Sequence, residues 1–191
     1  MAKALFVLGQ AASGKTQFAR KFIKAQLKKK HAWCLMDKDT SGARLSEALM
    51  RTLGFNPNDK DSIEYKEHVR DLEYQACLDI AREQLRLGLN VVLPGPWTKE
   101  VNDGTLFDID KLGFPFGTKI AHVYVDTPLD ELQKRIINRK KTRDEWKLNN
   151  WSEYSKCLLM PQAIRDRNTL IINNKQEFER QEREILRLFK L

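Results

Sequence analysis

A glycine-rich segment near the start of the chain has the residue types that bind phosphate groups. It reads Gly9-Gln10-Ala11-Ala12-Ser13-Gly14-Lys15-Thr16 and follows directly on a short apolar run. The two glycines let the backbone curl so that successive N–H groups point inward at an anion. Lys15 is spaced to reach β- and γ-phosphates, and Thr16 to offer its hydroxyl to Mg²⁺. The pattern predicts a nucleotide-binding loop formed by residues 9–16.

Two aspartates follow the second apolar run, in Asp37-Lys38-Asp39-Thr40. The carboxyl ends of parallel strands line the ligand crevice of an open sheet, so we expect both side chains to face the nucleotide. We assign Asp37 to hold Mg²⁺ through water, and Asp39 to orient an acceptor hydroxyl and take its proton. The same tetrapeptide fits a polar turn in which either aspartate caps the next helix. Arg44 fits an anion contact to the acceptor and a solvated helix position equally well.

A basic segment further along the chain is a candidate for closing over the phosphates. Arg135, Arg139 and Arg143 recur every four residues, which predicts that they share one face of a helix. Cationic side chains there would neutralise charge as the γ-phosphoryl group leaves, and we favour Arg139 and Arg143 for this catalytic role and Arg135 as a nucleotide contact. A solvated basic helix, with a nucleic-acid contact, is the alternative.

Trp97 lies just after the third apolar run, where a strand is expected to end. Its indole could stack on a ring of the acceptor, or it could fill the core at the edge of the crevice. We carry it forward as a candidate substrate residue.

The elements that must position these residues are visible as short apolar runs separated by helical patterns. Most runs are continuous, which is typical of strands covered on both faces. Strand alternating with helix five times predicts an α/β fold with a parallel sheet and helices on both faces. The runs are Ala4–Leu8, Ala32–Met36, Val91–Leu93, Ile120–Val125 and Leu170–Ile172.

The helical stripes have recognisable start and stop signals. One stripe runs from Tyr65 to Leu87, and Gly88 is positioned to end it. Another begins behind Thr127, the expected N-cap, with Pro128 at the first helical position. Two further stripes follow the glycine loop and close the chain.

The bulk composition agrees with one globular domain over residues 1–191. The chain has 41% hydrophobic and 31% charged residues, and no apolar run approaches the length of a membrane span. Three widely spaced cysteines do not suggest a disulfide framework, so we expect reduced thiols and a cytoplasmic protein. The formal net charge of +8 suits anionic partners without choosing among them.

Together these features resemble the P-loop kinase-like proteins, which include the phage polynucleotide kinase domain, chloramphenicol phosphotransferase, the zeta toxins and, more distantly, shikimate and gluconate kinases. The resemblance covers Ala4 to about Ile172 and rests on the segments GQAASGKT, DKDT and RIINRKKTRD. It implies a three-layer P-loop NTPase fold with a five-stranded parallel sheet and a helical lid at about residues 134–150.

The resemblance also implies roles for individual residues. Lys15 and Thr16 would bind MgATP, Asp39 would be the base, and the arginines of RIINRKKTRD would contact the phosphates. One departure is that the third run ends Leu93-Pro94-Gly95-Pro96-Trp97, without the acidic residue with which many P-loop NTPases hold the metal. That departure places more weight on Asp37.

The function favoured by the sequence is transfer of the γ-phosphoryl group of ATP to a hydroxyl of a small acceptor. Two alternatives remain open: a kinase of a nucleic-acid 5′ end or nucleotide-sugar, and a nucleotide-gated regulatory or partner-binding ATPase. Residues 46–70 and 97–118, where an acceptor pocket would gain its character, contain no recognisable fingerprint. The sequence does not identify the acceptor or the oligomeric state.

Overall fold

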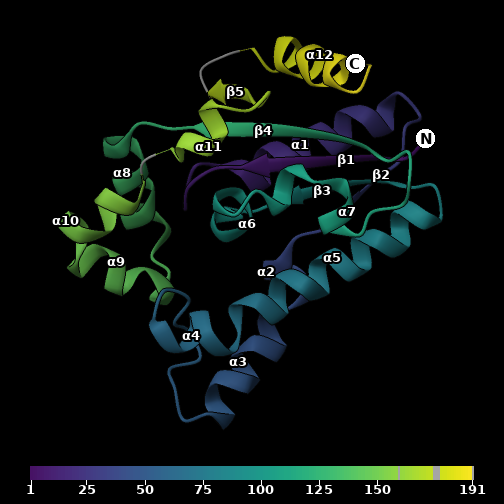
Figure 1. Ribbon diagram of the computed structural model, residues 1–191. Helices are drawn as coiled ribbons and strands as arrows, with labels where there is room; N and C mark the ends of the chain where they lie inside the picture. The colour runs from purple at the N-terminus through teal and green to yellow at the C-terminus, as the bar shows by residue number, and fades with distance from the viewer. Residues whose placement is uncertain (159, 174–176, 191) are drawn as a thin grey trace.

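A five-stranded, all-parallel sheet forms the centre of the computed structural model, which describes residues 1–158, 160–173 and 177–190. The strand order is β2-β3-β1-β4-β5 (Figure 1). This arrangement confirms the parallel α/β fold expected from the apolar runs. The strands are β1 (Lys3–Leu8), β2 (Trp33–Leu35), β3 (Asn90–Pro94), β4 (Lys119–Asp126) and β5 (Leu170–Asn173).

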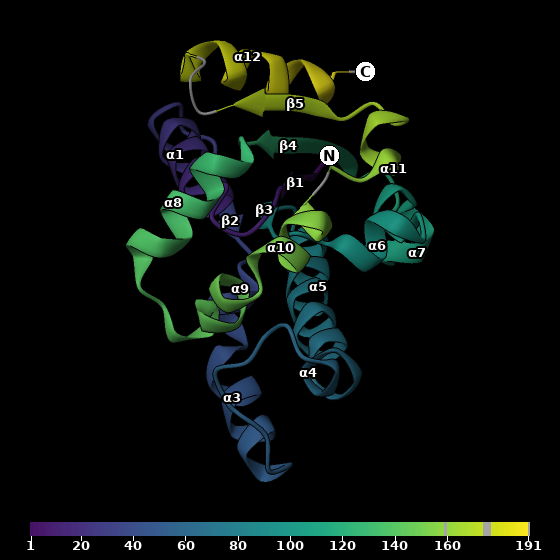
Figure 2. The same cartoon turned by 90° about the vertical axis from the view of Figure 1, so that its left-hand side faces the viewer.

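Helices cover both faces of the sheet because alternate residues of the strands point to opposite sides. On one face, Phe18 and Phe22 of α1 (Lys15–Lys28) pack with Ile185 of α12 (Phe178–Leu188) over β1 and β4. The other face is covered by α5 (Arg70–Arg86), α6 (Thr98–Asn102) and α7 (Ile109–Leu112). Figure 2 shows α12 and α5 on opposite sides of the strands.

Two groups of short helices lie beyond the carboxyl ends of the strands. The first follows β2 and contains α2 (Lys38–Ser41), α3 (Ala43–Thr52) and α4 (Ile63–His68). The second connects β4 to β5 and contains α8 (Leu129–Arg139), η2 (Thr142–Asp144), α9 (Glu145–Asn149), α10 (Trp151–Tyr154), η3 (Ser155–Leu158) and α11 (Gln162–Arg165). None of the helices in the described ranges has the length and apolar character needed to cross a membrane.

Two expectations about helix boundaries were wrong. The stripe from Tyr65 to Leu87 is two helices, because the backbone leaves the helical region at Val69 (φ −127°) between α4 and α5. The N-cap of α8 is Pro128, which was expected one position later at the first helical residue, and Thr127 lies outside the helix, where its hydroxyl donates to the carbonyl of Ser13 at 3.3 Å. Gly88 does end the second helix, with a left-handed φ of +81°.

A buried histidine on β4 makes the fold sensitive to acid. His122 lies between Phe6 and Phe107, and its Nε2 is 3.0 Å from the carbonyl oxygen of Leu106. Burial lowers the pKa of His122 to about 4, although the Leu106 contact opposes the shift. The folded protein therefore holds a neutral imidazole at pH values where an unfolded chain would bind a proton.

This shift predicts a loss of stability between pH 6.5 and pH 4. In that window the unfolded state binds a proton that the folded state does not. The free energy of unfolding should therefore decrease as the pH is lowered, by about 3 kcal/mol across the full range. The test is urea unfolding of the wild type and of His122→Gln at pH 7 and pH 4.5, which gives the slope of the unfolding free energy against pH for each protein. Subtracting one slope from the other removes the contributions of the carboxylates, which the two proteins share. Equal slopes for the two proteins would contradict the prediction.

Candidate active site

The loop between β1 and α1 has the backbone geometry of an anion cradle. Gly9 has φ +146°, Gly14 has φ +92°, and the N–H of Ser13 donates to the carbonyl of Gln10 at 3.1 Å. A Cβ at Gly9 would lie 2.6 Å from Ser13 Oγ and 3.0 Å from the carbonyl oxygen of Val125, so both the conformation and the space require glycine. Gly14 caps α1, and the free N–H groups of the first helical turn therefore face the loop.

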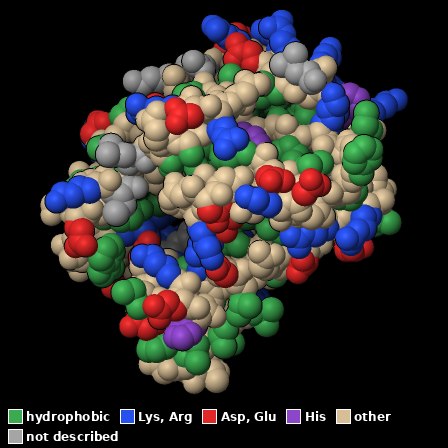
Figure 3. Space-filling model, in the orientation of Figure 1, with side chains coloured by type: hydrophobic (Ala, Val, Ile, Leu, Met, Phe, Trp, Pro, Cys, Tyr) green, Lys and Arg blue, Asp and Glu red, His purple; other side chains and the backbone are tan. Residues whose placement is uncertain are grey.

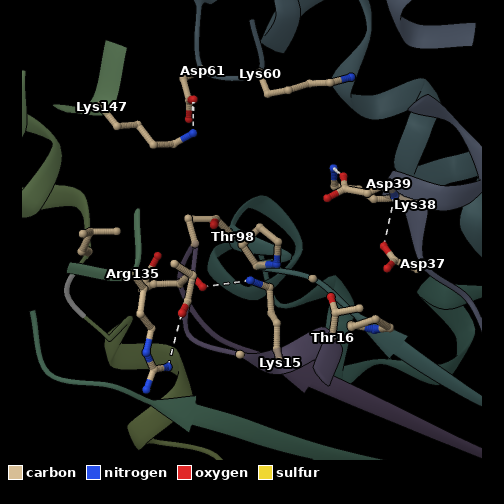
Figure 4. A pocket seen from close by; sticks show the side chains of 18 of the residues that line it. Lys15, Thr16, Asp37, Lys38, Asp39, Lys60, Asp61, Thr98, Arg135 and Lys147 are labelled. Carbon is tan, nitrogen blue, oxygen red and sulfur yellow. Dashed lines mark hydrogen bonds and ion pairs between the residues drawn. The ribbon is translucent and has the colours of Figure 1, made fainter. Parts of the chain in front are cut away.

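Lys15 is held across this loop. Its Nζ donates to the carbonyl of Gln10 at 2.9 Å, as Figure 4 shows. Burial lowers the pKa of Lys15 to about 8, with Asp39 opposing the shift and Arg139 adding to it. A buried ammonium whose charged form is disfavoured gains most from a bound anion, so this position suits a phosphate contact.

The two aspartates lie together at the carboxyl end of β2, as expected. Asp37 is the N-cap of α2, and its Oδ1 accepts from the N–H of Asp39 at 3.1 Å. Burial, followed by the negative charge of Asp39, raises the pKa of Asp37. Asp39 is more open, with 43% of its side chain exposed, and it accepts from Lys38 Nζ at 2.7 Å. Asp37 therefore caps α2 and also lies at the carboxyl end of β2, so the two interpretations of this segment do not exclude each other.

These groups line one cavity of about 1490 Å³. That volume exceeds the roughly 300–1,000 Å³ of a typical ligand pocket, which leaves room for two small molecules. Its mouth is visible in Figure 3 as a hollow with Lys, Arg, Asp and Glu side chains at the rim. The wall includes Gln10, Ala11, Ala12, Gly14, Lys15, Thr16, Asp37, Asp39, Arg135 and Arg139 from the residues singled out in the sequence.

The three arginines of the basic segment do not share one helix, contrary to expectation. The helix α8 ends at Arg139, Lys140 takes a left-handed φ of +46°, and Arg143 follows in the separate turn η2. The side chain of Arg143 lies outside the described part of the structure. Arg135 braces the phosphate loop by donating from Nη1 to the carbonyl of Ser13 at 3.3 Å.

Arg139 lies at the phosphate end of the cavity and is held by a buried carboxylate. Its Nε and Nη2 both donate to Asp144, which is 1% exposed. Burial would raise the pKa of Asp144, but Arg139 and Lys147 outweigh it and the pKa is lowered. A guanidinium fixed in this way loses little side-chain freedom on binding an anion.

Two candidate substrate residues lie away from the cavity. Trp97 is 1% exposed and packs edge-on against Phe6 and Tyr74, so the structure places its indole in the core and not against an acceptor. Arg44 is exposed on α3 and is not part of the cavity wall. The backbone before Trp97 does reach the cavity, through Pro94, Gly95 and Pro96.

The structure adds a buried polar cluster that the sequence did not reveal. Glu73 of α5 accepts from Tyr65 Oη, from Lys60 Nζ at 2.7 Å and from Lys38 Nζ at 3.5 Å, and Lys60 also contacts Ser46. Burial alone would raise the pKa of Glu73. The charge of Lys38 and the hydrogen bonds from Lys60, Tyr65 and Ser46 outweigh burial, so the pKa is lowered. Lys38, Lys60 and Tyr65 line the cavity, so Glu73 organises this wall from behind. The partners come from four segments, and no spacing rule links them.

A second wall is fixed by an arginine that sequence analysis also missed. Arg70 donates to both oxygens of Glu100, at 2.8 Å and 2.7 Å, and its guanidinium lies 4.0 Å from the centre of the Tyr74 ring. Burial would lower the pKa of Arg70, but Glu100 outweighs it and raises the pKa further above its ordinary value. Arg70 is therefore held at the cavity wall by the Glu100 carboxylate and the Tyr74 ring.

The residues present fit a magnesium nucleotide. The hydroxyl of Thr16 and the carboxylate of Asp37 both line the phosphate end of the cavity, and Mg²⁺ prefers such oxygen ligands together with phosphates and water. Burial raises the pKa of Asp37, and the negative charge of Asp39 beside it raises the pKa further. A divalent cation beside them would relieve the repulsion between the two carboxylates.

Comparisons with known proteins agree with this fold. A family model described as an AAA domain matches residues 5–157. A candidate kinase from Chloroflexus aurantiacus has a TM-score of 0.69 at 15% identity, with 97% of each chain covered. The APS kinase of Mycobacterium tuberculosis, in complex with AMPPNP and APS, has a TM-score of 0.60 at 16% identity, covering 100% of this chain and 98% of the other.

A gluconokinase from Sinorhizobium meliloti has a TM-score of 0.56 at 16% identity, covering 98% of this chain and 91% of the other. At such identities these likenesses establish the fold alone. A comparison with curated proteins gave no match.

Proposed function

The chain belongs to the AAA domain family, with a fold shared by several kinases, and from that premise we propose that it is a phosphotransferase. The proposed reaction moves the γ-phosphoryl group of MgATP to a hydroxyl of a small-molecule acceptor. The family match and the parallel sheet also confirm the resemblance to P-loop kinase-like proteins. ATP as the donor and a small acceptor are parts of the proposal.

The observation that carries the proposal is one cavity with three chemically different walls. The phosphate loop with Lys15 forms one wall, and Arg139 lies at the same end. Asp37 and Asp39 form the second, at the carboxyl end of β2. The third is the polar wall held by the ion pairs of Glu73 and Arg70. A nucleotide-binding module without an acceptor would need only the first.

Each residue has a defined task in the proposed reaction. The loop N–H groups and Lys15 would hold the β- and γ-phosphates, and Thr16 and, through water, Asp37 would hold Mg²⁺. Asp39 accepts the proton of the acceptor hydroxyl. At the same time the hydroxyl oxygen bonds to the γ-phosphorus, and the bond between the γ-phosphorus and the β,γ-bridging oxygen breaks. Arg139 offsets the charge that develops on the leaving phosphate, and ADP is the second product. We take residues 134–150, which carry this arginine, as the lid.

The proposal is tested by ADP formation from MgATP in the presence of pooled acceptors. The pools are nucleosides, nucleotide-sugars, sugar acids, aminoglycosides and 5′-hydroxyl oligonucleotides. We expect one pool to raise turnover above the ATP-only rate, and Lys15→Ala to lower that rate by about 10²- to 10³-fold, as for loss of one strong transition-state contact. Nucleotide binding without stimulation by any pool would contradict the phosphotransferase proposal and favour a nucleotide-gated partner binder.

A further inference from the structure

An ion pair crosses the cavity between two segments that are far apart in the sequence. Asp61, just before α4, lies 2.6 Å from Lys147 Nζ on α9. Lys147 is well buried, with 6% of its side chain exposed, and Asp61 is half-buried. Figure 4 shows the pair on the opposite side of the cavity from Lys15 and Thr16, beside Lys60. The pair therefore joins the segment beside the polar wall held by Glu73 to the proposed lid.

The pair continues into the arginine at the phosphate end. Lys147 Nζ also lies 3.3 Å from Asp144 Oδ1, and the same carboxylate accepts from Arg139. Arg139 lines the cavity, and its positive charge contributes to the lowered pKa of Lys15. A continuous chain of charged contacts thus runs from Asp61 through Lys147 and Asp144 to Arg139.

The charges along this chain balance in pairs. Asp61 and Asp144 carry the two negative charges, and Lys147 and Arg139 the two positive ones. Without Asp61, Lys147 would lose a carboxylate 2.6 Å away and would draw more strongly on Asp144, the carboxylate that also holds Arg139. Buried charged groups respond strongly to such a loss, because the remaining partner stays desolvated.

We propose that Asp61 and Lys147 are positioning residues that link residues 60–74 to Arg139 and hold its guanidinium ready for the phosphates, so that the bridge strengthens nucleotide binding. This inference rests on the proposed function, in that the acceptor is taken to bind beside residues 60–74. Coupling between two sites is reciprocal by thermodynamic linkage, so an acceptor that strengthened the bridge would itself bind more tightly in the presence of nucleotide. Neither residue has to touch the reacting atoms.

The test measures binding of the non-hydrolysable nucleotide MgAMPPNP by titration calorimetry, which needs no acceptor. We expect Asp61→Asn to weaken binding about five-fold, the lower end of typical coupling between sites. In a Lys147→Met background the same substitution should have no further effect, since the bridge is already broken. Asp61→Glu, which keeps the carboxylate, should retain most of the affinity.

The controls separate positioning from simple destabilisation. Asp130→Asn removes an exposed pair with Lys134 on α8 and should leave the Kd unchanged. Thermal midpoints identify any variant that fails to fold, and a merely structural role of the bridge would lower the midpoint without changing the Kd. An unchanged Kd in Asp61→Asn, or an equal loss in both backgrounds, overturns the inference. Failure of every acceptor pool would instead count against the proposed function and leave this binding test intact.

Discussion

Asp39→Asn is expected to lower acceptor-dependent phosphoryl transfer by about 10²- to 10⁴-fold, the usual contribution of a general base. Asn has the shape of Asp but cannot take the proton of the acceptor hydroxyl. The substitution should not disturb the local backbone, because Asp37 and not Asp39 caps α2. The Asp39 side chain is 43% exposed, and Lys38, which it contacts, keeps Glu73 as a carboxylate partner after the substitution.

The measurement is kcat for ADP formation with the stimulating acceptor, alongside the Kd for MgATP. We expect the Kd to change little, because Asp39 is assigned to the acceptor and not to the phosphates. Asp37→Asn is the matched comparison, and it should raise the Mg²⁺ concentration needed for half-maximal turnover. If Asp39→Asn keeps its turnover while Asp37→Asn loses it, the two roles are exchanged.

Glu73→Gln is expected to destabilise the protein by about 3–5 kcal/mol, the cost of removing one partner from a buried ion pair. The Glu73 side chain is 4% exposed, and the ammonium groups of Lys38 and Lys60 both face it. With an amide in its place, Lys60 would lose the carboxylate that it contacts, and Lys38 would keep Asp39 but lose Glu73. The hydroxyl of Tyr65 would also lose its carboxylate acceptor.

Urea unfolding at pH 7 measures this loss, and α5 itself offers a control. Glu83 pairs with Arg86 on the same helix, but both side chains are more than half exposed. Glu83→Gln should therefore cost no more than about 1 kcal/mol. If the two variants unfold at the same urea concentration, the cluster around Glu73 does not contribute as its burial suggests.

The sequence by itself determined the parts of this protein that depend on neighbours along the chain. The phosphate loop was predictable because Gly9, Gly14, Lys15 and Thr16 act through one continuous turn between a strand and a helix. The five strands were predictable because a strand covered on both faces must be apolar along its length. The position of the Asp37–Thr40 segment followed from the end of the second apolar run.

The tertiary structure alone decided which distant side chains meet. Lys140 turns the chain out of α8, and the equal spacing of Arg135, Arg139 and Arg143 could not show that turn. The ring of Trp97 lies in the core, where it packs edge-on against Phe6 and Tyr74.

The polar clusters behind and across the cavity depend on tertiary packing in the same way. The cluster around Glu73 and the bridge from Asp61 to Lys147 join segments that periodicity treats as unrelated surface. Periodicity reports only which side of an element is buried, whereas an ion pair across a cavity requires the relative placement of whole elements, which is set by long-range packing.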